Sequence, residues 1–159
     1  MTPPSAALAL EIGMQVHSEL LGSLEVDPGE LIGFPQGLFG FPECRSFVLI
    51  STEREGVYWL QSVEHSALAF LLVDPFLHFD GYSVEIAPAD LAELHSGENG
   101  NVVILAIVTL PQTRDERPTA NLQGPLAFNL NARVAKQLAC AETKFGTRAP
   151  FDLLAGARE

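Results

Sequence analysis

IGFPQGLFGFP, residues 32–42, combines five large apolar residues, three glycines and two prolines in eleven positions. No regular helix or strand favours this mixture. Pro35 fixes its own φ and favours an extended Phe34, while Gly37 and Gly40 can take the positive φ values that let a chain double back. The segment predicts a tight, mostly buried turn, and on these residues alone an ordinary strand-to-strand corner is an equally good interpretation. The residues expected to anchor this corner in the core are Phe34, Leu38, Phe39 and Phe41.

Segments of strand character lie on both sides of this corner. Some alternate apolar and polar residues, which is typical of a strand with one buried face, and others are continuous apolar runs of strand length. Turn signals such as Asp27-Pro28-Gly29 and Asn99-Gly100 separate them. The expected strands cover residues 14–20, 24–26, 46–50, 57–60, 68–73, 82–86, 102–110 and 121–130, the last one interrupted at Gly124-Pro125.

One short helix is predicted at about residues 88–96. Pro88 suits its first position, Asp90 complements the helix dipole, and Gly97 is a suitable stop. The segment 132–142 is ambiguous, because its alanines favour a helix although a strand is the preferred interpretation. Many short strands with one helix predict an all-β, antiparallel fold that is closed or nearly closed on itself.

Several separated motifs point to one family. After the corner come LQSVE at 60–64, FLLVDP at 70–75 with Tyr82, TANL at 119–122 with Pro125, and Asn129 through Arg133 to Lys136-Gln137. In this order and spacing the set resembles the flagellar assembly factor FliW family over residues 14–154. The resemblance implies a small β-barrel-like domain, here residues 14–159, with a strand after Gln137. It also implies a cytoplasmic bacterial protein that binds flagellin and the RNA-binding regulator CsrA and catalyses nothing.

Composition agrees with a single domain. The chain has 159 residues, 47% of them hydrophobic, and no apolar run approaches the roughly 20 residues that cross a bilayer. Residues 1–13 lack the basic start of a secretory signal and are expected to be a flexible tail. Cys44 and Cys140 have no neighbouring partner, which favours free thiols in a reducing compartment, although a long-range disulfide stays open.

Charge is distributed unevenly along the chain. Residues 1–110 carry 15 acidic side chains against Arg45 and Arg54, a net charge of −13, whereas residues 111–159 carry +2. An acidic surface repels phosphate backbones, so direct nucleic-acid binding is not expected. A basic protein would be attracted, and simple acidic solubility explains the composition about equally well.

No constellation predicts catalysis, a cofactor or a metal. The four histidines are never two to four residues apart, as a local metal site would require. Ser62, Glu64 and His65 lie too close in sequence for the geometry of a triad. Asp90 and Glu93 are interpreted as a solvated helix face.

Partner contact is therefore assigned to polar residues near strand ends. The five candidates are Gln61, Glu64, Asp74, Asp80 and Asn121. The amides Gln61, Asn121, Asn129 and Gln137 could equally tie turns together, because buried amides must be hydrogen-bonded. Trp59 is interpreted as a core residue. The chain is expected to act as a monomer.

Two alternatives to a specific protein binder remain. One is a small β-barrel enzyme or ligand- or metal-binding protein with a site near Asp74, His78 and Asp80. The other is a generic acidic chaperone with interchangeable partners.

Overall fold

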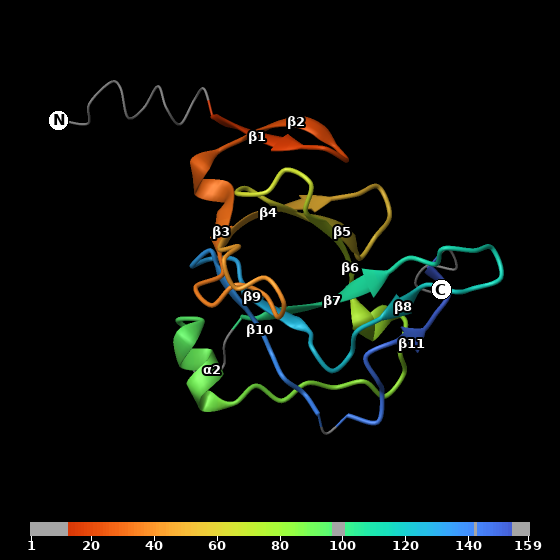
Figure 1. The fold of residues 1–159 in the computed structure, drawn as a ribbon. Helices are drawn as coiled ribbons and strands as arrows, with labels where there is room; N and C mark the ends of the chain where they lie inside the picture. Colours follow the sequence, from red (N-terminus) through yellow and green to blue (C-terminus); the bar gives the residue numbers. More distant parts are fainter. Residues whose placement is uncertain (1–12, 97–100, 142, 154–159) are drawn as a thin grey trace.

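A computed structural model describes residues 13–96, 101–141 and 143–153. Within these residues, seven strands follow one another around a closed ring, as Figure 1 shows. The order around the ring is β3 (Leu31–Gly33), β4 (Ser46–Ser51), β5 (Val57–Ser62), β6 (Ala69–Val73), β7 (Val103–Thr109), β9 (Leu126–Asn129) and β10 (Val134–Gln137). The predicted all-β, barrel-like fold is confirmed.

The pairing of β10 with β3 is parallel, through Val134 and Gly33, whereas every other pair in the ring is antiparallel. The expectation of a purely antiparallel sheet is wrong at this one contact. The reason is topological, because strand directions cannot alternate all the way around a ring with an odd number of members. One parallel pair is the minimum that closes such a barrel.

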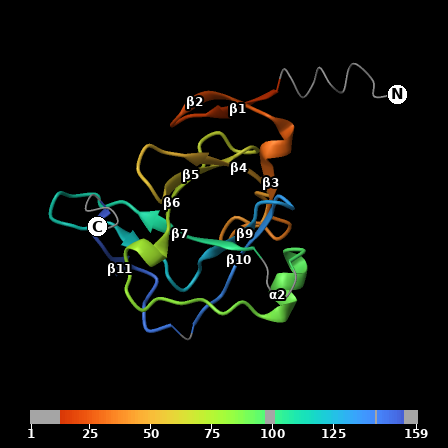
Figure 2. The same cartoon turned by 180° about the vertical axis from the view of Figure 1, so that it is seen from behind.

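Three further pieces extend the barrel. A separate hairpin of β1 (Met14–Ser18) and β2 (Gly22–Val26) confirms the predicted opening hairpin and packs Val16 and Val26 against Val48 of β4. The short strands β8 (Thr119–Ala120) and β11 (Ala149–Pro150) continue the sheet beyond β7. Figure 2 shows the hairpin and these two strands on different sides of the ring.

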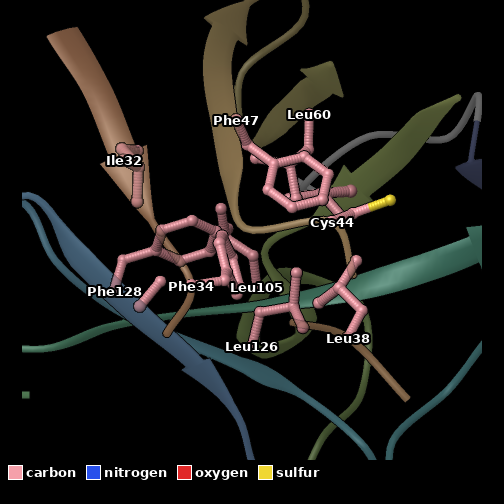
Figure 3. Close-up of a cluster of buried hydrophobic side chains, with 11 residues drawn as sticks. Ile32, Phe34, Leu38, Cys44, Phe47, Leu60, Leu105, Leu126 and Phe128 are labelled. Atoms are coloured by element: carbon pink, nitrogen blue, oxygen red, sulfur yellow. The ribbon is translucent and has the colours of Figure 1, made fainter. Parts of the chain in front are cut away.

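The corner at 32–42 fills the barrel interior with aromatic rings. Phe34 is fully buried, with its ring centroid 5.0 Å from that of Phe47 and 5.7 Å from that of Phe128, both edge to face. Figure 3 shows these rings meeting among side chains from β3, β4, β5, β7 and β9. The predicted positive φ values are present at Gly37 (68°) and Gly40 (88°).

Phe39 was expected in the core, and that expectation is wrong, since the residue is 60% exposed. Leu38 and Phe41 exchange both backbone hydrogen bonds, at 3.2 and 2.7 Å. Phe39 and Gly40 are therefore the two tip residues of a tight turn. The flanking residues attach the turn to the barrel, and a side chain at the tip points away from it. The Phe39 ring therefore lies at the surface.

The predicted strand at 82–86 is also wrong. This stretch is extended and its burial alternates, with Tyr82 buried and Val84 and Ile86 partly buried, but it forms no ladder. It crosses the outside of the barrel between the 3-10 turn η2 (Pro75–Leu77) and the helix α2 (Pro88–Glu93). Alternation reports which side of an extended chain is buried and says nothing about whether a backbone partner exists.

The helix α2 begins at Pro88 as predicted but ends at Glu93, short of residue 96. Ser96 N–H donates to Leu91 O and His95 N–H donates to Ala92 O, the paired bonds of a Schellman cap. His95, with φ 56°, takes the left-handed position that was assigned to Gly97. Gly97 and the Asn99-Gly100 turn lie outside the described residues, as do residues 1–12 of the expected tail.

The ambiguous segment 132–142 contains a strand, as preferred, but β10 ends at Gln137 instead of starting after it. Leu138 and Cys140 then donate their N–H groups to Pro125 O and Gln123 O, both at 2.8 Å, without forming a regular strand. Cys44 and Cys140 are both free thiols. Trp59 is partly buried against the cluster that includes Val57 and Leu71, which agrees with a core role.

Candidate partner-binding surface

The structure divides the five predicted contact residues among three places. Gln61 lies near the end of β5 and Glu64 in the turn between β5 and β6, whereas Asp74 and Asp80 flank η2 beyond the other end of β6. A five-residue strand spans about 15 Å at roughly 3.3 Å per residue. Asn121 lies in the turn after β8. The five residues therefore do not form one patch.

Gln61 stabilises the β5–β6 turn through its buried side chain. Its side chain is fully buried, and its Nε2 donates to the carbonyl oxygens of Ser62, His65 and Ser66 at 3.0, 3.4 and 3.2 Å. This placement is that of a residue tying a turn together, and contact of Gln61 with a partner stays a prediction.

Glu64 is exposed on the same turn. Its two carboxylate oxygens accept hydrogen bonds from the backbone N–H groups of Arg45 and Ser46, each at 3.3 Å. Glu19, at the tip of the β1–β2 hairpin, contacts the turn as well, because its N–H donates to Ser66 O at 2.9 Å. Glu43 lies close to His65 of this turn. We call the surface formed by the exposed residues Glu19, Glu43 and Glu64 the acidic edge.

Ser62 and His65 do not form the nucleophile and base of a triad. Ser62 is fully buried, and its Oγ accepts the backbone N–H of His65 at 3.0 Å. Ser62 also hydrogen-bonds with the side chain of Cys44. The pKa of the Cys44 thiol is raised, mainly by burial and also by the nearby carboxylates of Glu43 and Glu64. The hydrogen bond with Ser62 acts in the opposite direction.

Asp74 and His78 serve separate structural roles, and Asp80 is exposed. The Asp74 carboxylate caps η2 by accepting Phe76 N–H at 3.0 Å, and the His78 ring packs on Phe151 with centroids 4.9 Å apart. Burial lowers the pKa of His78, while Asp74 and Asp152 act in the opposite direction. Across the part of the chain that the structure describes, the three predicted residues do not converge on one point where an ion could sit.

The remaining amides tie turns together. Asn121 Oδ1 accepts the N–H groups of Gln123 and Gly124, at 3.1 and 2.9 Å, and Asn121 is partly exposed. Asn129 Nδ2 donates to Leu94 O at 2.8 Å and so joins the end of α2 to β9. Both amides make the hydrogen bonds expected of residues that tie turns together, and contact of Asn121 with a partner stays a prediction.

Asp90 and Glu93 do not form a purely solvated face, because both carboxylates pair with Lys136 of β10. The distance from Lys136 Nζ to Asp90 Oδ1 is 2.8 Å. The pKa of Lys136 is raised, first by its hydrogen bond with Asp90 and then by that with Glu93. Sequence reasoning missed this pairing since the two elements lie far apart in the chain.

The exposed aromatic residue of the corner was missed as well. Phe39 is 60% exposed, and it does not line the small cavity of about 150 Å³ that is bounded by Pro35, Gln36, Glu93, Ala135 and Lys136. Large exposed apolar side chains often mark a surface that another protein covers. Phe39 is thus a candidate contact residue that the family motif alone did not indicate.

Among the described residues, no helix is long and apolar enough to span a membrane. Residues 15–151 match the family model described as FliW protein. Two curated relatives, both called flagellar assembly factor FliW, cover most of the chain. The protein of Natranaerobius thermophilus is 36% identical over 87% of this chain and 92% of its own length. The protein of Moorella thermoacetica is 38% identical over 85% and 86% respectively.

A solved structure agrees with both sequence comparisons. The crystal structure of a flagellar assembly factor FliW superimposes on this chain with a TM-score of 0.78 at 30% sequence identity. The superposition covers 86% of this chain and 96% of the solved one. Sequence and fold therefore lead to the same group of proteins.

Proposed function

The chain belongs to the FliW protein family, and we propose that it is a cytoplasmic flagellar assembly factor that binds flagellin and, alternately, CsrA. Binding to CsrA would relieve repression of flagellin translation, and free flagellin would reverse this by occupying the chain. The observation that carries the proposal is the family match over residues 15–151. In this function the chain acts by binding, without catalysis, a cofactor or direct contact with nucleic acid.

The acidic edge is the proposed CsrA contact. Glu19, Glu43 and Glu64 are exposed around one turn, in a segment whose net charge is −13. A surface of this sign attracts the basic surface of an RNA-binding protein. It also repels RNA phosphates, although only within a Debye length of about 8 Å at physiological salt. The same residues therefore favour CsrA and disfavour its RNA.

The tip of the corner is the proposed flagellin contact. Phe39 exposes 60% of its surface, yet its backbone is held by the Leu38–Phe41 pairing and by Gln137. A rigidly held aromatic side chain loses little conformational freedom on binding, so it is well suited to anchor an apolar segment. We assign Phe39 to flagellin because the acidic edge is already assigned to CsrA, and we expect flagellin to bind through apolar contacts.

Calorimetry with purified partners tests this function. The chain is titrated with flagellin and with CsrA at low and high salt, and then with CsrA already bound to the leader of flagellin messenger RNA. We expect binding of both proteins, a strong salt dependence for CsrA alone, and release of the leader RNA, which added flagellin prevents. Absence of binding to either protein would refute the proposal, and equal binding of unrelated proteins would indicate a generic chaperone.

A further inference from the structure

Three potential metal ligands meet at the end of the corner. The ligand atoms of Glu43, Cys44 and His65 all lie within 4.8 Å of one another. Cys44 is buried, whereas Glu43 and His65 are exposed, so the group is open to solvent on one side. Figure 3 shows Cys44 at the edge of the core cluster, with its sulfur directed away from Phe34 and Phe128.

We propose that Glu43, Cys44 and His65 bind a divalent metal ion of the zinc class. A thiolate, an imidazole nitrogen and a carboxylate oxygen are the ligand types that Zn²⁺ takes in proteins. Bond lengths of about 2.0–2.3 Å put the ligand atoms of a tetrahedral site roughly 3.5 Å apart. The ligand atoms all lie within 4.8 Å of one another, and rotation of the exposed Glu43 and His65 side chains would bring them to this separation. The fourth position is left to water.

The backbone that carries these ligands is held in place by buried polar groups. Ser62 Oγ accepts the His65 N–H at 3.0 Å and hydrogen-bonds with the Cys44 side chain, so one buried hydroxyl links two of the three ligands. Gln61 Nε2 fixes the carbonyl groups of the turn that bears His65. A supporting shell of this kind is what keeps a metal site close to its binding geometry.

The local charge favours a cation. The Cys44 thiolate and the Glu43 carboxylate would neutralise a divalent ion, and the Glu64 carboxylate lies close enough to interact electrostatically with Cys44. Glu64 is itself held by the N–H groups of Arg45 and Ser46. A bound ion would cross-link the corner to the β5–β6 turn, and it would therefore stabilise the folded state by mass action.

This inference is independent of the proposed partners, and Co²⁺ provides its test. We expect the reduced full-length chain to bind about one Co²⁺ with a sulfur-to-cobalt charge-transfer band and the visible bands of tetrahedral coordination, and Zn²⁺ to displace it. C44S should lose the charge-transfer band, E43Q should weaken binding, and H65A should lose tetrahedral coordination. C140S is the matched control, because Cys140 is partly buried and belongs to no such group in the described chain.

Thermal unfolding gives a second readout. Zn²⁺ should raise the midpoint of the wild-type chain and of C140S but not that of H65A, whose substitution is at an exposed position and should leave the fold intact. A wild-type chain without the charge-transfer band would overturn the proposal. A band that persists in C44S, or that disappears in C140S, would overturn it equally, since the sulfur ligand would then not be Cys44.

Discussion

The backbone N–H of Phe39 donates a hydrogen bond of 2.8 Å to the side-chain Oε1 of Gln137, across 98 positions of sequence. The other end of the same amide donates from Nε2 to Gly124 O, also at 2.8 Å. Gln137 is buried, so one side chain joins the corner, β10 and the turn before β9. The tip that exposes Phe39 is thereby fixed to the barrel.

Replacing Gln137 by Leu should be strongly destabilising. The substitution leaves the buried Gly124 carbonyl and the partly buried Phe39 N–H without their partner, and an unsatisfied buried group costs about 1–3 kcal/mol. We expect the free energy of unfolding, measured by urea denaturation, to fall by about 2–4 kcal/mol. Q15L on the exposed face of β1 is the control and should change it by less than about 0.5 kcal/mol. Equal losses in both variants would contradict the role of Gln137.

Gly37 and Gly40 should respond differently to Ala, although both have positive φ. A Cβ on Gly37 would lie 2.6 Å from Pro42 Cα and 2.7 Å from Phe41 O, whereas a Cβ on Gly40 meets nothing within 4 Å. G40A should cost only the backbone strain, about 1–2 kcal/mol. We expect G37A to cost at least about 2 kcal/mol more, because the contacting atoms are backbone and cannot move aside. Similar melting temperatures for the two variants would refute the clash.

Lys136→Met should weaken the attachment of α2 to β10. The ion pairs with Asp90 and Glu93 are partly exposed, so we expect a loss of about 1 kcal/mol at neutral pH. The pKa of Lys136 is raised in the folded chain, and its contribution is therefore fully present below the unfolded value of about 10.5 and is lost as the pH rises through the folded value. Urea denaturation should show the difference between wild type and K136M shrinking in that alkaline range.

A double-mutant cycle isolates this pairing. D90N alone and K136M alone should each destabilise, and the combined variant should lose less than their sum. Strict additivity would show that Lys136 acts through packing of its aliphatic stem instead of its charge.

Phe39→Ala should reduce flagellin affinity with little effect on stability. Truncating an aromatic anchor costs about 2 kcal/mol of binding free energy, which is roughly thirtyfold in Kd. Titration calorimetry measures this change, and F76A is a matched control because Phe76 is also exposed, at 48%, but lies on η2. A larger loss in F76A than in F39A would move the flagellin contact to η2.

Glu64→Gln should weaken CsrA binding and reduce its salt dependence. The amide oxygen can still accept one of the two backbone hydrogen bonds, so the substitution removes charge with little change in shape. We expect a loss of about 0.5–1 kcal/mol at low salt that becomes small at high salt. D80N is the comparison on the η2 side, and affinity for CsrA measured across salt concentrations should change little in that variant. The opposite ranking would place CsrA near Asp80.

Local chemistry made much of this protein predictable. The strand segments of the hairpin and of β4 to β7, the positive φ at Gly37 and Gly40, and the helix start at Pro88 all follow from interactions within a few residues. The family could also be identified, because its motifs are spread over nearly the whole chain.

Pairing and direction were decided only by the tertiary structure. The 82–86 stretch has strand periodicity but finds no ladder partner, and Phe39 has core composition but sits at a turn tip. Glu43, Cys44 and His65 meet because β4 pairs with β5. This pairing places the turn after β5 beside the residues that precede β4. Local sequence specifies backbone conformation and which side is apolar, whereas neighbours in space depend on how the whole ring closes.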